Sequence, residues 1–401
     1  MNVAGIITEY NPLHRGHLLQ LEQTRAVLGP ESAVICAMSG NFVQRGDFAL
    51  VRKHARAEAA VRSGADLVLE LPLPWAVSSA EGFAGGAVEV LAATGLVTHL
   101  SFGSECGDAA ALAEVAAVLD SPEFHDRLRV LLEGGMSYAA CRQAAAEELL
   151  GAEKAALLAQ PNNNLGVEYC RAIARQNCGI VPMTVLRRGA AHDGETVDGI
   201  ASASVVRALV RQGKTDEALG LMAPAMAEIF RREEAAGRAP VLAETCERAM
   251  LARLRTMTDE EFAALDEGGE GLGNRFRTAA RTAATLSELL DAVKTKRYVY
   301  ARLRRMALWA YLGMTPAMRP KSVPYIRVLA ANETGRMLLK QMRKKASLPV
   351  ITKPAEARRL SGAAGELFAL EARATDLYTL GYPNLGAAPA GSEWMESPVI
   401  L

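Results

Sequence analysis

The sequence lacks any apolar run close to the ~20 residues that a membrane-spanning helix needs, and its first residues carry no basic leader. We therefore predict neither a signal peptide nor a membrane span. Spacings of the CxxC type are also missing, because the six cysteines are scattered over 401 residues. Scattered cysteines predict reduced packing residues in a cytoplasmic protein and argue against a structural zinc or other metal site.

Net charge is absent as well, since 45 basic residues balance 45 acidic ones, but the balance hides a local excess. Between Asp291 and Lys345, fourteen Lys or Arg residues stand against two acids, an excess of twelve. An excess of this size favours a face that binds nucleic acid, and a solvated helix surface is the alternative. The candidate nucleic-acid-binding residues are Lys294, Lys296, Arg297, Arg302, Arg304 and Arg305 on one predicted helix, and Lys340, Arg343, Lys344 and Lys345 in a second cluster.

Short apolar runs alternate with helical patterns along the first hundred residues. Strands are predicted at residues 3–8, 33–38, 65–71 and 98–103, with helices of about 10 to 15 residues between them. This alternation predicts βαβ units with right-handed crossovers, and hence an α/β fold with a Rossmann-like parallel sheet. Ligands of such sheets bind beyond the carboxyl ends of the strands. The polar loops after the first, second and fourth strands should therefore line one cleft.

Helical patterns dominate the rest of the chain. Residues 108–176 are rich in Ala and predict a helical insertion that covers the cleft, and a Ser-x-Ser sequence begins a predicted helix at 202–211. Isolated strand signals occur at residues 181–186, 325–329 and 348–351. The end of the chain, 386–401, is rich in Gly, Ala and Pro and predicts a loosely held tail.

The most specific motif, His14-Arg15-Gly16-His17, ends the run from Glu9 to His17 that comes directly after the first predicted strand. HxGH at the first strand-to-helix turn resembles the HIGH signature of nucleotidyltransferases and class I aminoacyl-tRNA synthetases. When the α-phosphate of ATP is attacked, imidazole N–H groups can donate hydrogen bonds to its oxygens, and Gly16 lets backbone N–H groups approach the phosphates. We predict that His14 and His17 are catalytic; histidines that only satisfy local hydrogen bonds are the alternative.

A second motif runs from Ile200 to Arg207 and contains Ser202 and Ser204. It resembles the ISSTxIR-like element of nucleotidyltransferases, which stands where synthetases have KMSKS. Serine hydroxyls and helix N-terminal amides can bind the β- and γ-phosphates, and Arg207 can neutralise charge on the departing pyrophosphate. Ser204 and Arg207 are therefore candidate catalytic residues, with an ordinary helix cap as the alternative.

Longer strings extend the resemblance to one family, the bacterial tRNA(Met) cytidine acetate ligases. These strings cover nearly the whole chain, at residues 9–17, 38–47, 64–72, 102–105, 161–166 and 293–298. The resemblance implies that acetate attacks ATP, giving acetyl-adenylate and pyrophosphate, and that the wobble cytidine of elongator tRNA(Met) then takes the acetyl group, giving 4-acetylcytidine and AMP. It implies ATP, with Mg2+ on its phosphates, acetate and tRNA(Met) as the ligands, and no obligate protein partner.

The same resemblance assigns a function to each of the two domains that a chain of this length favours. Residues 1–215, with the helical insertion at 108–176, are expected to form the nucleotidyltransferase domain that binds ATP and acetate. Residues 216–401 are expected to form a mainly helical, basic domain that binds tRNA.

The nucleotide contacts of the family carry over onto four parts of this sequence. They are Ile7, Thr8, Glu9, Tyr10, Asn11, Pro12, Leu13, His14, Arg15, Gly16, His17, Leu18, Leu19 and Gln20, then Gly103, then Asn162 and Asn163, then Arg187 and Arg188. Asn162 and Asn163 could instead cap the helix that begins there. Arg187 is favoured for a phosphate contact because a guanidinium can bind two oxygens. The family's aromatic residue before His192 is absent here, so the choice between Arg187 and Arg188 stays open.

Two other functions stay open. A small-molecule adenylyltransferase, of the pantetheine-phosphate or nicotinamide-mononucleotide type, would use the same motifs, but a small substrate needs no basic segment at 291–345. A non-catalytic RNA-binding protein on the same fold would have no need for intact His14, Gly16, His17, Ser204 and Arg207.

Overall fold

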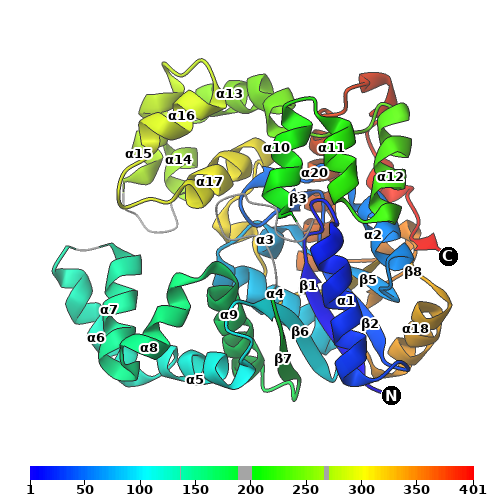
Figure 1. Ribbon diagram of the computed structural model, residues 1–401. Coiled ribbons are helices and arrows are strands. Elements are labelled where there is room, and N and C mark those ends of the chain that lie inside the picture. The colour runs from blue at the N-terminus through cyan, green and yellow to red at the C-terminus, as the bar shows by residue number, and fades with distance from the viewer. Residues whose placement is uncertain (136, 188–200, 266–270) are drawn as a thin grey trace.

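The computed structural model describes residues 1–135, 137–187, 201–265 and 271–401. At its centre is an eight-stranded sheet in the order β10-β8-β5-β2-β1-β6-β7, with β9 paired to β8 off this path (Figure 1). The strands of this sheet are β1 (Val3–Thr8), β2 (Ala33–Ser39), β5 (Leu67–Leu71), β6 (His99–Ser104), β7 (Val181–Leu186), β8 (Ile326–Ala331), β9 (Val350–Ile351) and β10 (Val399–Ile400). A separate hairpin joins β3 (Phe42–Val43) to β4 (Asp47–Phe48).

The middle of the sheet is parallel, because β1 pairs with β2 and β6, β2 with β5, and β6 with β7 in that sense. Every position of β1, β2 and β5 is buried, as expected for strands with helices on both faces. Side chains alternate between two cores, so that Ile35 and Ala37 join one cluster and Val34 and Cys36 join the other. The predicted α/β fold with a Rossmann-like parallel sheet is confirmed.

Helices cover both faces of the sheet (Figure 1). The helices that bury side chains in the Val34 core are α1 (Arg15–Leu28), α2 (Lys53–Arg62), α10 (Ala203–Arg211), α11 (Thr215–Leu221) and α12 (Pro224–Ala235). Those that bury side chains in the Ile35 core, early in the chain, are α3 (Leu73–Ala76), α4 (Ala80–Ala93), α5 (Ala109–Leu119), α6 (Pro122–Glu133), α7 (Tyr138–Leu150), α8 (Ala152–Ala155) and α9 (Pro161–Gln176). None of the helices in the described ranges has both the length and the hydropathy to cross a membrane.

The second half of the chain adds further helices to the Ile35 core. They are α13 (Glu247–Thr256), α14 (Asp259–Leu265), α15 (Leu272–Ala280), α16 (Leu286–Val293), α17 (Tyr300–Leu312), α18 (Glu333–Lys345), α19 (Pro354–Ala357) and α20 (Gly362–Thr379). Short 3-10 turns lie at η1 (Ala156–Ala159), η2 (Ala243–Cys246), η3 (Pro316–Met318), η4 (Leu385–Ala387) and η5 (Ser392–Trp394). One core cluster therefore continues through both halves of the sequence.

The sheet extends across the predicted domain boundary between residues 215 and 216. β8 pairs antiparallel with β5, with Leu69 opposite Val328, and every residue of β8 is buried. The strand signals at 325–329 and 348–351 correspond to β8 and β9, but a strand signal does not say with which strand it pairs. The sheet thus includes strands from both sides of the predicted boundary, and the assignment of separate functions to residues 1–215 and 216–401 stays a prediction.

The C-terminal segment is packed, which corrects the prediction of a loose tail. β10 pairs with β8 through Val399 and Ala330, and the side chain of Glu393, in η5, is 1% exposed. The composition of 386–401 predicted mobility, because Gly, Ala and Pro bury little surface. Composition alone does not reveal that a buried charged side chain, that of Glu393, holds the segment.

The predicted helix over Lys294 to Arg305 is interrupted. α16 ends at Val293 and α17 begins at Tyr300, so that Lys294, Lys296 and Arg297 lie in the connection. There the Arg297 N–H donates to the Thr295 hydroxyl at 3.2 Å, a local side-chain bond that competes with the helix. Of the predicted basic residues in this region, Arg302, Arg304 and Arg305 lie on a helix.

Candidate active site

The candidate active site is built where β1 ends and α1 begins. His14 is the N-cap residue of α1, and its Nδ1 accepts the Gly16 N–H at 3.1 Å. His17, one turn into the helix, accepts the His14 N–H on its own Nδ1 at 3.2 Å. The two imidazole rings stack with their centroids 3.7 Å apart. These side chains bind the free N–H groups of the helix start that Ser or Asp usually caps, so the backbone fixes their orientation.

The surroundings keep both imidazoles neutral. Burial lowers the pKa of His14 to about 4, and the nearby Arg187 and Arg207 guanidinium groups add to the effect. Burial, His14 and Arg187 lower the pKa of His17 well below its usual value. Because each Nδ1 accepts a backbone N–H, the proton of each neutral ring is on Nε2. The site thus offers two Nε2–H donors close to two cations, an arrangement suited to phosphate oxygens.

Two arginines from different elements lie close to the histidines. Arg207, on α10, donates from Nη1 to the Asn11 carbonyl at 2.6 Å, and its buried Nε has no hydrogen-bond partner within the described ranges. Arg187 follows β7 and lies over Gly103, since a Cβ built on Gly103 would come within 3.1 Å of the Arg187 Cγ. A phosphate oxygen can satisfy an unpartnered guanidinium N–H. The predicted nucleotide roles of Arg207, Arg187 and Gly103 are compatible with this geometry and stay predictions.

The second predicted motif lies beside the first. Ser202 is the N-cap residue of α10 and accepts the Val205 N–H at 3.4 Å, so the capping alternative is confirmed for Ser202. Ser204 is exposed at the start of α10, with its hydroxyl 2.7 Å from that of Ser202. Arg188 and His192 belong to residues 188–200, outside the described part of the chain.

A buried arginine that the sequence did not single out fixes the ends of β1 and β2. Arg56, on α2, is fully buried and donates to the backbone carbonyls of Glu9, Ser39 and Gly40, the bond to Ser39 measuring 3.1 Å. Its Nε also binds the Val51 carbonyl at 2.8 Å. These carbonyls lie where the two strands end, so Arg56 positions the loops that follow. Nothing in the helical pattern of α2 distinguishes Arg56 from a solvated arginine.

Asn162 and Asn163, which were predicted to contact the nucleotide, hold the loop after β6 in place. Glu105, just after β6, accepts the N–H groups of Asn162 at 3.2 Å and Asn163 at 2.7 Å. Asn163 is fully buried and its side-chain oxygen accepts the N–H groups of Glu105 and Cys106. The N-cap residue of α9 is Gln160, so the alternative that an asparagine caps this helix is wrong. A nucleotide contact by Asn162, which is partly exposed, stays a prediction.

The rest of the predicted run divides into packing and exposed residues. Ile7, Tyr10 and Leu13 are buried in the two cores, and the Asn11 side-chain oxygen accepts the Leu50 N–H at 2.8 Å. Along α1, Arg15 is exposed, whereas Leu18, Leu19 and Gln20 are partly buried. The buried members of this run thus hold the loop in place, and their predicted nucleotide contacts stay predictions.

The hairpin β3–β4 contacts both the loop between β1 and α1, which leads to His14, and the basic helix α17. Gln44, in the hairpin, donates its N–H to Glu9 Oε1 at 2.9 Å, and its carbonyl accepts Arg305 Nη1 at 3.2 Å. Gly46 has φ +75°, and a Cβ there would lie 2.4 Å from the Arg305 backbone nitrogen. Position 46 therefore needs glycine for two reasons: a positive φ strains other residues, and a Cβ would clash with α17. The start of α17, with Arg302, Arg304 and Arg305, therefore adjoins the candidate active site.

The second basic cluster is on α18, which packs near the amino ends of the parallel strands, opposite to their carboxyl ends. Asn332, the N-cap residue of α18, donates its N–H to the carbonyl of Asp66, which precedes β5. At the other end of α18, the carbonyl of Lys345 packs against Gly95, which precedes β6. Figure 1 shows α18 apart from α17 and α10. Lys340, Arg343, Lys344 and Lys345 therefore do not share one surface with the cluster around α17.

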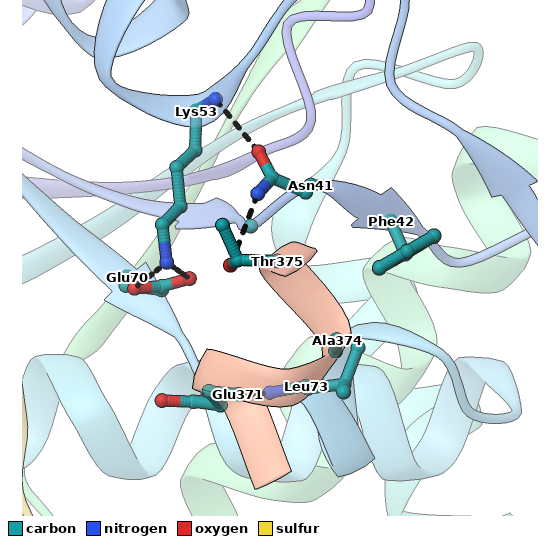
Figure 2. A pocket seen from close by; sticks show the side chains of 9 residues that line it. Asn41, Phe42, Lys53, Glu70, Leu73, Glu371, Ala374 and Thr375 are labelled. Carbon is teal, nitrogen blue, oxygen red and sulfur yellow. Dashed lines mark hydrogen bonds and ion pairs between the residues drawn. The ribbon is translucent and has the colours of Figure 1, made fainter. Parts of the chain in front are cut away.

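A small polar cavity, with room for about one water molecule, lies behind the hairpin (Figure 2). Lys53 Nζ binds Glu70 at 2.7 Å, and Glu393 of the C-terminal segment binds both Lys53 and Arg327. Burial and the negative Glu70 raise the pKa of Glu371, on α20, to about 7. Each charged group of the cavity thus has a charged or hydrogen-bonding partner.

This network also holds the turn at the end of β2. Asn41 accepts the backbone N–H of Lys53 at 2.9 Å and donates to the Thr375 hydroxyl at 3.3 Å, as Figure 2 shows. Thr375 in turn donates to Glu393 at 2.7 Å. The partners are far apart in sequence, 340 positions for Lys53 and Glu393, so no local pattern predicts them.

No group of three or more His, Cys, Asp or Glu that could hold a metal ion occurs among the residues that the structure describes. A family model described as HIGH Nucleotidyl Transferase matches residues 1–391. The parallel sheet, the stacked histidine pair at the end of β1 and this match together define a nucleotidyl transferase of the HIGH class.

Similarity to known proteins is more specific. The tRNA(Met) cytidine acetate ligase of Acetivibrio thermocellus is 36% identical over 416 residues, with both chains fully covered. That of Alkaliphilus metalliredigens is 37% identical, with 99% of this chain and 98% of the relative covered. The crystal structure of Thermotoga maritima TmcAL bound with alpha-thio ATP matches with a TM-score of 0.94 at 34% identity over the whole of both chains. The chain belongs to the tRNA(Met) cytidine acetate ligase family.

Proposed function

We propose that this protein activates acetate with ATP and transfers the acetyl group to the wobble cytidine of elongator tRNA(Met), giving 4-acetylcytidine, AMP and pyrophosphate. The observation that carries the proposal is the stacked pair His14 and His17, neutral and with both Nε2–H groups left to donate. The relatives carry this ligase name over the full length of the chain. The solved TmcAL structure holds an ATP analogue.

In the first step an acetate oxygen attacks the α-phosphate, and pyrophosphate leaves. The Nε2–H groups of His14 and His17 donate to the α-phosphate oxygens as negative charge builds there. Arg207 and Ser204, at the start of α10, bind the departing pyrophosphate, and Arg187 binds phosphate over Gly103. Mg2+ accompanies the ATP phosphates as part of the nucleotide substrate, since Mg2+ is held mainly by phosphates and water.

In the second step the tRNA lies along the basic surface that adjoins the hairpin. Arg302, Arg304 and Arg305 on α17, with Lys294, Lys296 and Arg297 before it, bind phosphates of the tRNA backbone. Residues 216–401 thus supply most of the tRNA contacts, whereas residues 1–215 supply the adenylation residues. Lys340, Arg343, Lys344 and Lys345 contact a more distant part of the same tRNA. We place the reaction in the cytoplasm, where tRNA is modified.

A small-molecule adenylyltransferase would use the same histidines. Its small substrate would not need the basic surface of α17. The full-length relatives are named as tRNA(Met) cytidine acetate ligases and not as small-molecule adenylyltransferases. The ligase is therefore the better supported function.

Exchange of labelled pyrophosphate into ATP tests the first step without tRNA. We expect exchange that depends on acetate, and His17→Ala should slow it by about 10²–10³-fold, the usual effect of losing one such donor. His125, exposed on α6, offers the matched control, because His125→Ala removes an imidazole away from the cleft. Exchange that needs no acetate, or a His17→Ala variant as active as His125→Ala, would refute the proposed first step.

A further inference from the structure

The second step of the proposed reaction needs a proton acceptor, and the inference below rests on that proposed function. The exocyclic amine N4 of cytidine is a weak nucleophile, because its lone pair is delocalised into the ring. When N4 bonds to the acetyl carbon, a proton must leave it. The two histidines are suited to donate from Nε2, and their Nδ1 atoms are already engaged by backbone N–H groups. A different group must therefore take the proton.

Three carboxylates lie after β6, within β5 and in the hairpin, and each has both oxygens engaged. Both oxygens of Glu105 bind the start of α9, and both of Glu70 bind Lys53. Asp47 pairs with Arg211 at 3.1 Å and accepts the Phe48 N–H with its other oxygen. These groups hold structure and are not free to bind a substrate amine.

Glu9, the residue directly after β1, differs from them. Its Oε1 accepts the Gln44 N–H at 2.9 Å, and within the described ranges its Oε2 has no hydrogen-bond partner. The side chain is half-buried. One oxygen is therefore fixed by the hairpin, while the other is left for a ligand and is not among the buried unpartnered atoms of the described ranges.

The surroundings of Glu9 hold it in one place. Arg56 binds the Glu9 backbone carbonyl, and the Gln44 side chain is itself anchored to the Ser78 carbonyl at 3.0 Å. The charge of Glu9 acts on both Arg207 of α10 and Tyr169 of α9, and on each it acts toward a higher pKa. The carboxylate is thus close enough to act on the predicted pyrophosphate ligand Arg207 and on α9 of the helical insertion, and it lies five positions before His14 in the same loop.

We propose that Glu9 is the catalytic base of acetyl transfer and binds the target cytidine through its N4 amine. A carboxylate is the usual acceptor for the N4 hydrogens of cytosine. Glu9 Oε2 accepts one N4 hydrogen and orients the base toward the acetyl group. The N4 lone pair then bonds to the acetyl carbonyl carbon, the bond from that carbon to the phosphate oxygen breaks, AMP leaves with the electron pair, and the N4 proton passes to Glu9.

The test compares Glu9→Gln with the wild type in two assays on the full-length protein. Glutamine keeps an oxygen to accept the Gln44 N–H, so the loop retains its bond while the base is lost. The first assay is acetate-dependent pyrophosphate exchange, and the second is single-turnover acetylation of a tRNA(Met) transcript, started with synthetic acetyl-adenylate. We expect acetylation to fall about 100-fold more than exchange, since a positioned general base contributes about 10²–10⁴-fold. Glu9→Asp, which keeps a shorter base, should recover part of the loss.

Glu89 provides a matched control. It is half-buried on α4 and its Oε1 accepts one backbone N–H, that of Val323, at 3.0 Å. Glu89→Gln therefore removes the same charge and keeps the same kind of bond, and it should leave both assays unchanged.

Three outcomes overturn the inference. Acetylation by Glu9→Gln at the wild-type rate would place the base elsewhere. Equal loss in both assays would make Glu9 part of the adenylation step instead. No recovery in Glu9→Asp, together with a melting temperature below that of Glu89→Gln, would make Glu9 structural. If the wild type itself forms no 4-acetylcytidine from acetyl-adenylate, the proposed function fails, which is a different result from any of these.

Discussion

Replacing Glu393 by Gln should destabilise the folded protein by about 3 kcal/mol. The Glu393 carboxylate is 1% exposed and binds Lys53 Nζ and Arg327 Nη1. It also accepts the Thr375 hydroxyl at 2.7 Å. Glutamine has nearly the same volume and can still accept from Thr375, so the substitution removes the charge and leaves the packing almost unchanged.

The magnitude follows from the charges that remain. Loss of one partner of a buried ion pair costs about 3–5 kcal/mol, and we expect the lower end because Glu70 still binds Lys53 at 2.7 Å. With an unfolding entropy of about 2.1 cal/mol/K per residue, cooperative unfolding of 401 residues carries roughly 0.8 kcal/mol/K. A loss of about 3 kcal/mol therefore lowers the melting temperature by roughly 4 °C.

Thermal unfolding at neutral pH measures this shift. The matched control is Glu148 of α7, which forms an exposed ion pair with Arg127 of α6. Glu148→Gln should leave the melting temperature within about 1 °C of the wild type. Adding Lys53→Met to Glu393→Gln should cause less loss than the two changes summed, because the substitutions remove partners of one another. A melting temperature unchanged by Glu393→Gln would refute the argument that charge pairing holds the C-terminal segment.

Stability should fall as the pH drops from 6.5 to 4, since burial holds the pKa of His14 at about 4 and the unfolded chain binds the proton first. This loss is absent above pH 6.5, reaches on the order of 3 kcal/mol by pH 4, and should be missing from urea titrations of His14→Gln. Replacing Lys294, Lys296 and Arg297 together by Ala should weaken tRNA binding and flatten its salt dependence; unchanged affinity would make them a solvated surface. Propionate should be used weakly in pyrophosphate exchange, because excluding one methylene is limited to about 1–3 kcal/mol; complete rejection would show a pocket closed to it.

The sheet and the histidine pair could be predicted because their signals are local. β1 and β2 are continuous apolar runs that are buried on both faces, and such runs stand out in sequence. His14 and His17 occur in a motif whose spacing places both rings at one helix start, where the structure finds them stacked. Ser202 was predicted at a helix start for the same reason and caps α10.

The features that escaped prediction depend on pairing across long distances in sequence. Strand β8 was recognised, but its antiparallel partner β5 lies in the other half of the chain. Arg56 follows the pattern of an ordinary helix, and its importance comes from three carbonyls that folding brings to it. Glu393 lies in a segment of poorly packing composition, and its partners, the buried Lys53 and Arg327, belong to other elements of the fold.

The central claim is that one protein makes acetyl-adenylate and passes the acetyl group to tRNA. The most direct measurement incubates the purified protein with ATP, carbon-14 acetate and a tRNA(Met) transcript, without acetyl-CoA, and analyses the digested nucleosides by mass spectrometry. We expect labelled 4-acetylcytidine at the wobble position and one AMP released for each acetyl group transferred. Acetylation that requires acetyl-CoA, or AMP formation with no acetylated cytidine, would contradict the account.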